Sequence, residues 1–467
     1  MSRNEMQGVP SMFLAISPLD GRYSEIGKAL SPYFSEYGLV KNRVWVEVNW
    51  LVFMLENLKG SKILEDFPKE RIPDILSIYE SFSAESFARV KEIEARTNHD
   101  VKAVELYIDE ELKVLGMDEL VSYVHIGCTS EDITNCAYAN IIKTSLHDVW
   151  IPEAEKLISI LEGFAMRYAD LSMLAHTHGQ PATPTTVGKE FAVFVHRLRN
   201  SLDYVKAIKP TAKFNGATGN YAAISVAFPN ENWPELAKKF IEETLGLTFN
   251  PVTTQIESHD YMCRLFDAVR HFNNVMLDLD RDMWLYISME YFGQKVVKNE
   301  VGSSTMPHKV NPIKFENSES NIDTSNGLLL SLSNKLACSR MQRDLSDSSS
   351  QRNIGVAFGY SLQAIRQTIS GMGRVQVNSQ KITEALESNW EVLAEPIQTV
   401  LRKYGIPDAY DRLKELTRGK RISKEDIQEF IKSLDVLSDE DRDNLLRLTP
   451  EDYVGYACQI AEKTANK

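Results

Sequence analysis

The apolar positions of this chain follow a helical spacing almost throughout. The clearest stretch lies at 261–292, where apolar side chains recur at alternating intervals of three and four residues: Met262, Leu265, Val269, Phe272, Met276, Leu279, Met283 and Tyr286. This repeat places one apolar stripe along a helix, over roughly 36 Å at 1.5 Å per residue. A stripe this long needs partner helices of similar length. We therefore expect a long-helix bundle, shared between subunits.

Other stretches carry the same helical pattern. A second amphipathic helix at 186–208 has apolar residues at Val187, Phe191, Phe194, Leu198, Leu202 and Val205. Further helices are predicted at 37–58, 69–82, 84–95, 103–113, 133–170 with a break at Pro152, 311–333, 355–373, 380–404 and 422–435. No alternating strand pattern and no internal repeat is visible. The predicted fold class is all-α, with three helical domains at 1–118, 119–372 and 373–467.

Composition and charge narrow the function classes. The 467 residues are 43% hydrophobic and 25% charged, with a formal net charge of −13. Such an acidic protein is a poor general binder of nucleic acid or anionic membranes. Its five cysteines form no CxxC pair, which favours a reducing compartment. No apolar run reaches the roughly 20 residues of a membrane helix, and we expect a cytoplasmic protein without nucleic-acid or membrane partners.

The stretch 302–312 is the first candidate for chemistry. Its glycine and its two serines, Ser303 and Ser304, favour a mobile loop. Asn311 is a suitable N-cap and Pro312 suits the first helical position, so the loop ends where a helix N-terminus favours anions. Lys309 adds a full positive charge. An ordinary loop before a helix explains the same residue types.

A histidine loop at 175–184 is the second candidate. Two prolines and a glycine interrupt the helical pattern there and hold His176 and His178. A His-x-His pair can bind metal, but no acidic or cysteine cluster completes a site in this stretch. We expect no metal, and we favour a histidine that transfers protons.

Several polar clusters lie between these loops and the chain ends. They contain Arg22 and Tyr23 after a turn, Asn98, His99 and Asp100, then His125, Thr129 and Ser130, and finally Arg343, Ser348 and Arg352. Surface charge, and capping of a helix by Thr129 or Ser130, explain these residues without any ligand. Together with the two loops they suit proton transfer on an anionic substrate, such as elimination next to a carboxylate. The sequence contains no P-loop and no dinucleotide-binding fingerprint.

Longer motifs carry a resemblance to a known family. The segment 302–312 with Met-Pro-His-Lys at 306–309, the segment 177–184, Thr97-Asn98-His99-Asp100, His125 with 128–132, 342–344, the opening 17–23 and the late 389–398 resemble the fumarase/aspartase superfamily. Members of that superfamily eliminate fumarate from substituted succinates. The motifs are most similar to the bacterial long-chain branch that cleaves adenylosuccinate.

The resemblance implies both an activity and an assembly. The activity is the elimination of fumarate from adenylosuccinate, giving AMP, and from succinylaminoimidazole carboxamide ribotide (SAICAR), giving AICAR, without a cofactor. The assembly is a homotetramer with a shared core of twenty helices, in which each active site takes residues from three subunits.

The resemblance also assigns roles to residues of this chain. Ser303 would be the general base and His178 the general acid, with Glu316 orienting His178 and Lys309 supporting the charge. The expected substrate-binding residues are Arg22, Tyr23, Asn98, His99, Asp100, His125, Thr129, Ser130, Gln255, Ser304, Asn311, Arg343, Ser348 and Arg352.

Three other functions compete with this one. The nearest is another lyase of the superfamily, such as an argininosuccinate lyase or a carboxymuconate cycloisomerase, which has no need for the arginines at 22, 343 and 352. Ser303, Ser304 and a lysine also resemble the parts of an amidase-type serine nucleophile. A helical scaffold without catalytic activity is the third alternative.

Overall fold

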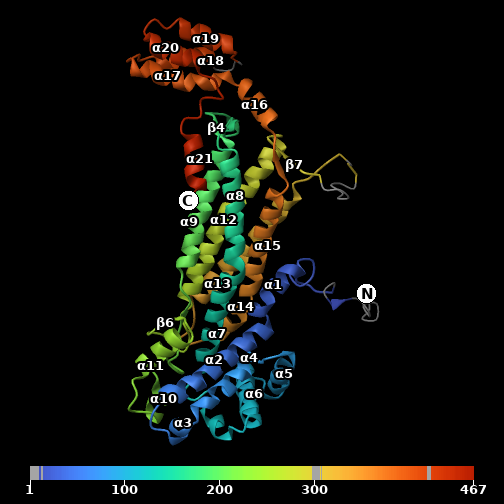
Figure 1. The fold of residues 1–467 in the computed structure, drawn as a ribbon, viewed down its shortest axis with the longest axis vertical. Helices are drawn as coiled ribbons and strands as arrows, with labels where there is room; N and C mark the ends of the chain where they lie inside the picture. Colours follow the sequence, from blue (N-terminus) through green and yellow to red (C-terminus); the bar gives the residue numbers. More distant parts are fainter. Residues whose placement is uncertain (1–9, 12–13, 297–304, 307, 418–421, 467) are drawn as a thin grey trace. The chain divides into compact units, whose positions relative to one another are not determined.

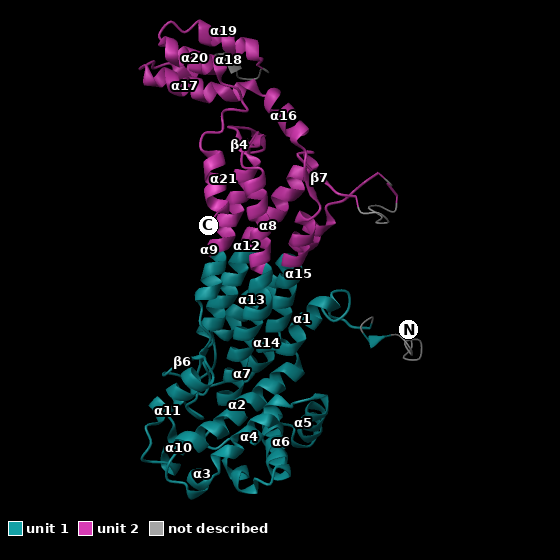
Figure 2. Cartoon of the chain, viewed as in Figure 1, with its two compact units in different colours: residues 1–153, 201–273, 321–364 teal, residues 154–200, 274–320, 365–467 magenta. Residues whose placement is uncertain are grey.

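The computed structural model describes residues 10–11, 14–296, 305–306, 308–417 and 422–466. The chain forms two compact units, each built from three separate segments (Figure 2). Unit 1 contains residues 1–153, 201–273 and 321–364, and unit 2 contains residues 154–200, 274–320 and 365–467.

Helices make up most of the described chain, so the predicted all-α class is confirmed (Figure 1). The first are α1 (Ser24–Phe34), α2 (Glu36–Asn57), α3 (Lys62–Asp66), α4 (Ile72–Glu80), α5 (Ala84–Thr97), α6 (Asp100–Val114) and α7 (Ser130–Ser145). Next come α8 (Ile151–Arg167), α9 (Val187–Ala207), α10 (Ala222–Ala227), α11 (Trp233–Lys239), α12 (Asp260–Ser288), α13 (Ile313–Leu336), α14 (Ser346–Gln351) and α15 (Ile354–Met372). The last are α16 (Ser379–Glu387), α17 (Ala394–Lys403), α18 (Ala409–Thr417), α19 (Lys424–Lys432), α20 (Asp439–Arg447) and α21 (Ala457–Ala465).

The apolar stripe predicted between residues 261 and 292 forms α12. Seven of its eight members, all but Tyr286, are at most 1% exposed. One chain therefore buries this stripe by itself, and the stripe gives no argument for a second subunit. Helices α13 and α15 of the same chain supply partners for α12, and a bundle shared between subunits stays a prediction.

The chain stays helical through Pro152, where a kink or break was predicted, but the helix changes its type just before this residue. A π-helical turn, Leu146–Trp150, joins α7 to α8, and Pro152 is the second residue of α8. Proline lacks the N–H that would bond one turn back, so the helix loosens just before it.

Helix α2 forms the core of unit 1, where it packs against α7, α4 and α6. Val44 and Val48 lie on one face of the helix and Val46 on the opposite face, and all three are 0% exposed, as in a helix buried on every side. Arg43 and Glu47 of the same helix are each 2% exposed. Buried charges of this kind need partners, and these partners belong to the site described below.

Short strands are the part of the fold that the sequence did not predict. They are β1 (Ser172–Met173), β2 (His176–Thr177), β3 (Gln180–Pro181), β4 (Thr185–Thr186), β5 (Thr211–Ala212), β6 (Thr248–Phe249), β7 (Phe292–Gln294) and β8 (Val375–Val377). They pair as β1–β4, β2–β3 and β7–β8, all antiparallel, and as β5–β6, which is parallel. Two or three residues are too few to show an alternating pattern.

The single helix predicted at 380–404 is wrong, because it consists of α16, a 3-10 turn and α17. The Ser388 hydroxyl donates to the carbonyl of Glu384 at 2.7 Å, and the Asn389 amide donates to the carbonyl of Ala385 at 2.7 Å. Such side-chain bonds to the backbone compete with helix continuation. The division into domains at residues 118 and 372 remains a prediction.

Candidate active site

The predicted site residues fall into two groups. Unit 1 contains Arg22, Tyr23, Asn98, His99, Asp100, His125, Thr129, Ser130, Gln255, Arg343, Ser348 and Arg352. Unit 2 contains His178, Lys309, Asn311 and Glu316. Ser303 and Ser304 lie outside the described residues, so the roles predicted for them remain predictions.

His125 is bound to a fully buried glutamate of helix α2. Its Nδ1 lies 2.6 Å from Oε1 of Glu47, and its Nε2 lies 3.7 Å from Oε1 of Glu105. Burial works to lower the pKa of His125, but the bond to Glu47 and the negative charges of Glu47, Glu105 and Asp132 together outweigh it and raise that pKa. For the carboxyl of Glu47, by contrast, burial is the main cause that raises the pKa. Both shifts favour a proton held between the two side chains.

Asp100 lies between two arginines at the start of α6. Its Oδ2 is 2.8 Å from Nη1 of Arg43 and 3.5 Å from Nη2 of Arg352. Arg352 also pairs with Glu36. Asp100 therefore positions the two arginines, and its predicted contact with substrate stays a prediction.

The two residues before Asp100, Asn98 and His99, cap the ends of helices. Asn98 has φ +52° and caps the end of α5. Nδ1 of His99 accepts from the backbone N–H of Lys102 at 3.1 Å, which makes His99 the N-cap of α6. About half of the His99 side chain remains exposed, so its predicted contact with substrate stays a prediction.

Thr129 caps helix α7, as predicted. Thr129 and Asp132 form a capping box, in which the Thr129 N–H donates to Oδ2 of Asp132 at 2.8 Å. Ser130 is the first residue of the helix. The first turn of α7 is therefore fixed in place.

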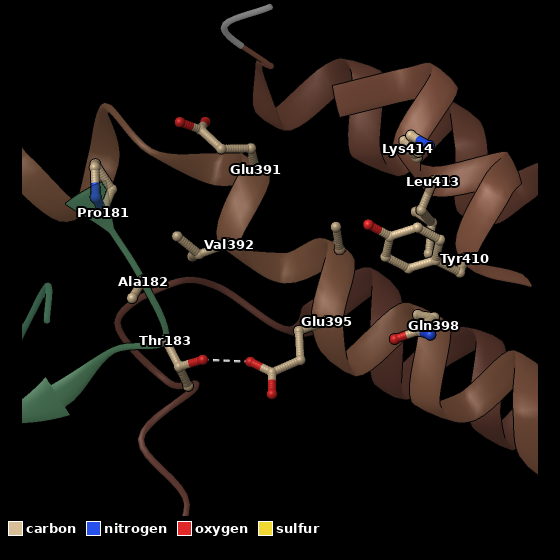
Figure 3. A pocket seen from close by; sticks show the side chains of 11 residues that line it. Pro181, Ala182, Thr183, Glu391, Val392, Glu395, Gln398, Tyr410, Leu413 and Lys414 are labelled. Atoms are coloured by element: carbon tan, nitrogen blue, oxygen red, sulfur yellow. Dashed lines mark hydrogen bonds between the residues drawn. The ribbon is translucent and has the colours of Figure 1, made fainter. Parts of the chain in front are cut away.

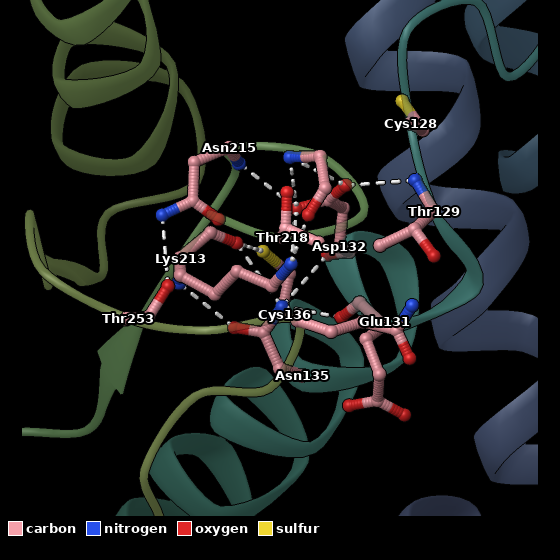
Figure 4. Close-up of polar contacts among 12 residues, drawn as sticks. Cys128, Thr129, Glu131, Asp132, Asn135, Cys136, Lys213, Asn215, Thr218 and Thr253 are labelled. Atoms are coloured by element: carbon pink, nitrogen blue, oxygen red, sulfur yellow. Dashed lines mark hydrogen bonds and ion pairs between the residues drawn. The ribbon is translucent and has the colours of Figure 1, made fainter. Parts of the chain in front are cut away.

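Lys213 and Asp132 form an ion pair that the sequence did not reveal (Figure 4). Lys213 Nζ lies 2.9 Å from Oδ1 of Asp132, and both side chains are 0% exposed. Asp132 also accepts from the backbone N–H of Asn215, and Lys213 donates to the carbonyl of Gly216. The pair ties the start of α7 to the loop after β5. The Thr-x-x-Asp spacing gave a signal for Asp132, whereas an isolated lysine gives none.

Arg343 reaches into the same region of unit 1. Its Nη2 lies 2.8 Å from Oε1 of Glu131, and its Nη1 lies 3.5 Å from Oε1 of Gln255. Burial raises the pKa of Glu131 to about 7, although Arg343 opposes that shift. The charge of Arg43 also lowers the pKa of Glu131. The Arg343–Glu131 pair therefore lies close to the Arg43–Asp100 pair. Sequence reasoning treated Glu131 only as a favourable acid in a first helical turn.

The remaining predicted residues of unit 1 lie on the turn before α1 and on or just after α14. Arg22 is exposed and Tyr23 half-buried, at the end of the predicted turn, and Ser348 is half-buried in α14. Arg352 lines two cavities, of about 200 and 250 Å³. The larger of the two is also lined by the turn, through Ser17 and Leu19.

In unit 2, His178 lies at the tip of a hairpin. Strands β2 and β3 are joined by His178 and Gly179 alone, with φ +54° and +71°. Positive φ at both positions is what a type I′ turn requires. The turn leaves the imidazole exposed.

A cavity of about 750 Å³ adjoins the far end of this hairpin within unit 2 (Figure 3). Residues after β3 line one side, where Thr183 bonds to Glu395 of α17. Helix α18 lines the other side with Tyr410 and Lys414.

The predicted partner of His178 bonds elsewhere. Oε1 of Glu316 accepts from Nε1 of Trp284 at 3.2 Å. Between Glu316 and His178 no bond is formed in the described part of the chain. The orientation of His178 by Glu316 therefore stays a prediction.

The helix expected at Asn311 starts slightly later. Helix α13 begins at Ile313, and the carbonyl of Pro312 accepts from the N–H groups of Phe315 and Glu316. The predicted cap at Asn311 was thus one residue too early. Lys309 is exposed just before this helix start.

Over the residues described, no group of three or more His, Cys, Asp or Glu side chains is arranged to hold a metal. Within the same ranges, no helix is long and apolar enough to span a membrane.

Two family models match the chain. One, described as Lyase, matches residues 21–322, and the other, described as Adenylosuccinate lyase C-terminal, matches residues 339–454. Fold and sequence therefore define a lyase of the fumarase/aspartase superfamily.

Relatives with known names narrow the family. The adenylosuccinate lyase of Escherichia coli (strain K12) is 45% identical over 454 residues, covering 97% of this chain and 99% of the relative. The adenylosuccinate lyase of Haemophilus influenzae is 45% identical over 456 residues, with 97% and 99% covered. The chain belongs to the adenylosuccinate lyase family of carbon–nitrogen lyases.

Solved structures confirm the fold. A 3-carboxy-cis,cis-muconate lactonizing enzyme from Pseudomonas putida has a TM-score of 0.72 at 21% identity, covering 94% of this chain and 96% of the other. A fumarate lyase from Mesorhizobium sp. BNC1 has a TM-score of 0.74 at 17% identity, covering 95% and 97%. At these identities the likeness concerns the fold alone.

Proposed function

We propose that this protein eliminates fumarate from adenylosuccinate, releasing AMP, and from SAICAR, releasing AICAR, as two steps of purine nucleotide synthesis. The observation that carries the proposal is the 45% identity to adenylosuccinate lyases over 97% of the chain. Both substrates join a succinyl group to nitrogen and carry a ribose phosphate.

The proposed chemistry is general acid–base catalysis. Ser303 removes a proton next to a carboxylate of the succinyl group, and His178 protonates the leaving nitrogen. Lys309 and the start of α13 stabilise the negative charge that develops on the carboxylate. The exposed position of His178 at the tip of its hairpin supports this role, because its imidazole is free to meet a substrate.

The binding part of the proposal concerns anions. Arginine is suited to phosphate because its guanidinium presents several donors in one plane. We assign the phosphate and ribose to Arg22, Tyr23, Arg343, Ser348 and Arg352, and the two cavities beside Arg352 support this choice. We assign the carboxylates to Thr129, Ser130, Gln255, Ser304, Lys309 and Asn311, with Asn98, His99, Asp100 and His125 completing the site.

We further propose a cytoplasmic homotetramer in which several chains build each active site. Large apolar side chains exposed on long helices support association: Val193, Tyr204, Trp284, Leu285 and Leu330. Mixing the inactive variants His178→Ala and Arg343→Ala tests the shared site. Recovery of activity after subunit exchange is expected. A tetramer that never regains activity contradicts the proposal.

A spectrophotometric comparison of three substrates tests the reaction itself. We expect cleavage of adenylosuccinate and no reaction with argininosuccinate or 3-carboxy-cis,cis-muconate at micromolar enzyme. The reverse preference would assign the chain to another lyase of the superfamily. An acyl-enzyme on Ser303, seen by mass spectrometry, would instead favour the amidase. Purine prototrophy that survives both Ser303→Ala and His178→Ala would favour the scaffold.

A further inference from the structure

Glu131 is a buried acid for which the reaction proposed above has no use. We propose that Glu131 is the resting counter-ion of Arg343, which the substrate's phosphate displaces, and that the displaced carboxylate takes up a proton. This inference rests on the proposed function, because it assumes that Arg343 holds the phosphate of a nucleotide.

The pair is buried and incompletely bonded. The side chains of Glu131 and Arg343 are 4% and 19% exposed, and one bond of 2.8 Å joins them. Oε2 of Glu131 and Nε of Arg343 are buried without a hydrogen-bond partner among the described residues. A carboxylate that matched the guanidinium would use two parallel bonds. The single bond leaves donors of Arg343 for another anion.

The nearby cations are already committed to other acids. Lys213 is bound to Asp132 at 2.9 Å, and Arg43 is bound to Asp100 at 2.8 Å. The remaining charged group that acts strongly on Glu131 is Asp347 of α14, which is itself negative. Arg343 is therefore the cation that does most to lower the pKa of Glu131, with smaller contributions from Lys213 and Arg43.

A phosphate beside Arg343 changes this balance. It competes with Glu131 for the guanidinium donors and adds negative charge in a buried setting. Burial already raises the pKa of Glu131 to about 7, and Asp347 raises it while Arg343 lowers it. With Arg343 turned to a phosphate dianion, the carboxylate loses its main stabilising partner and becomes protonated near neutral pH.

Proton uptake then accompanies nucleotide binding. At pH 8 most of the ligand-free protein carries ionised Glu131, whereas the phosphate complex carries the neutral acid. Each bound AMP therefore takes up close to one proton. By linkage, the affinity for AMP falls as pH rises above 7, approaching roughly tenfold per pH unit.

Titration calorimetry of the full-length protein with AMP at pH 8, in two buffers of different ionisation enthalpy, measures this uptake. AMP is a dianion at pH 8, because the second pKa of a phosphate monoester is about 6. We expect uptake close to one proton for the wild type and close to zero for Glu131→Gln, which keeps the size and an acceptor for Arg343. Glu110→Gln is the matched control, since Glu110 pairs with Arg89 and that bond lowers its pKa. On binding AMP, the Glu110→Gln protein should take up as many protons as the wild type.

Two results would overturn the proposal. One is AMP binding by the wild type without proton uptake, which needs no variant. The other is an uptake by folded Glu131→Gln equal to that of the wild type. Failure of the wild type to bind AMP at all would reject the proposed function as well, so the two failures are distinguishable.

Discussion

In unit 1, His125 and Arg343 are bound to buried carboxylates, whereas in unit 2 the predicted acid His178 stands at the exposed tip of a hairpin. Glu47, Glu131 and Asp132 are all at most 3% exposed, and they hold His125, Arg343 and the start of α7. Ion pairs and hydrogen bonds within unit 1 therefore hold His125, Arg343 and the start of α7 in place. Within the described residues, no such contact holds the imidazole of His178.

The largest expected effect concerns the exposed region. His178→Ala should lower kcat by roughly 10²–10⁴-fold, the usual contribution of a general acid, with little change in melting temperature because the side chain is exposed. Steady-state kinetics on adenylosuccinate and a thermal melt check this. His147→Gln, at a histidine that is 86% exposed, is the control and should keep full activity. Equal losses for both variants would remove the special role of His178.

The buried region should respond in stability. Lys213→Met leaves Asp132 as an unpaired buried charge and should lower the free energy of unfolding by about 3–5 kcal/mol. Lys28→Met removes a surface pair with Glu25 and should cost at most about 1 kcal/mol. Denaturant unfolding measures both. A similar cost for the two would show that the Lys213–Asp132 pair is not held as described.

The capping boxes of the two units provide a finer comparison. Thr129→Ala at α7 and Ser423→Ala at α19 should each lower the free energy of unfolding by about 1 kcal/mol. Only Thr129→Ala should also raise KM for adenylosuccinate, because only that helix start belongs to the proposed site. A change of KM in Ser423→Ala would contradict the claim that only the start of α7 belongs to the proposed site.

The smallest expected effect is a pH slope that originates in unit 2. Asp280 on α12 accepts from Thr368 on α15, and burial raises the pKa of this aspartate well above its usual value. The folded chain then keeps this proton to higher pH than the unfolded chain, so stability falls as pH rises above the usual aspartate range. Asp280→Asn should flatten the profile of melting temperature between pH 5 and 8. An unchanged slope would contradict the raised pKa.

Much of the helical frame was predictable because apolar spacing is a local signal. The stripe from Met262 to Met283 predicted α12, and Pro152 marked the region where a π-helical turn joins α7 to α8. The two-residue strands were not predictable, since β2 and β3 are defined by a turn rather than by alternation.

The sequence motifs pointed to candidate residues but not to the contacts that these residues make. Motifs identified His125 and Arg343, but Glu47 and Glu131 became visible only once α2 and α7 were packed around them. Pairs separated by 78 or 212 residues in the chain leave no trace in local spacing. Glu316 and His178 are also far apart in the sequence, so local spacing could not show whether they make contact.

Proton NMR of adenylosuccinate incubated with the purified protein tests the central claim most directly. The account predicts that AMP and fumarate appear in equal amounts at micromolar enzyme, and that His178→Ala yields neither over the same time. Adenylosuccinate that remains intact with the wild-type protein would contradict the account.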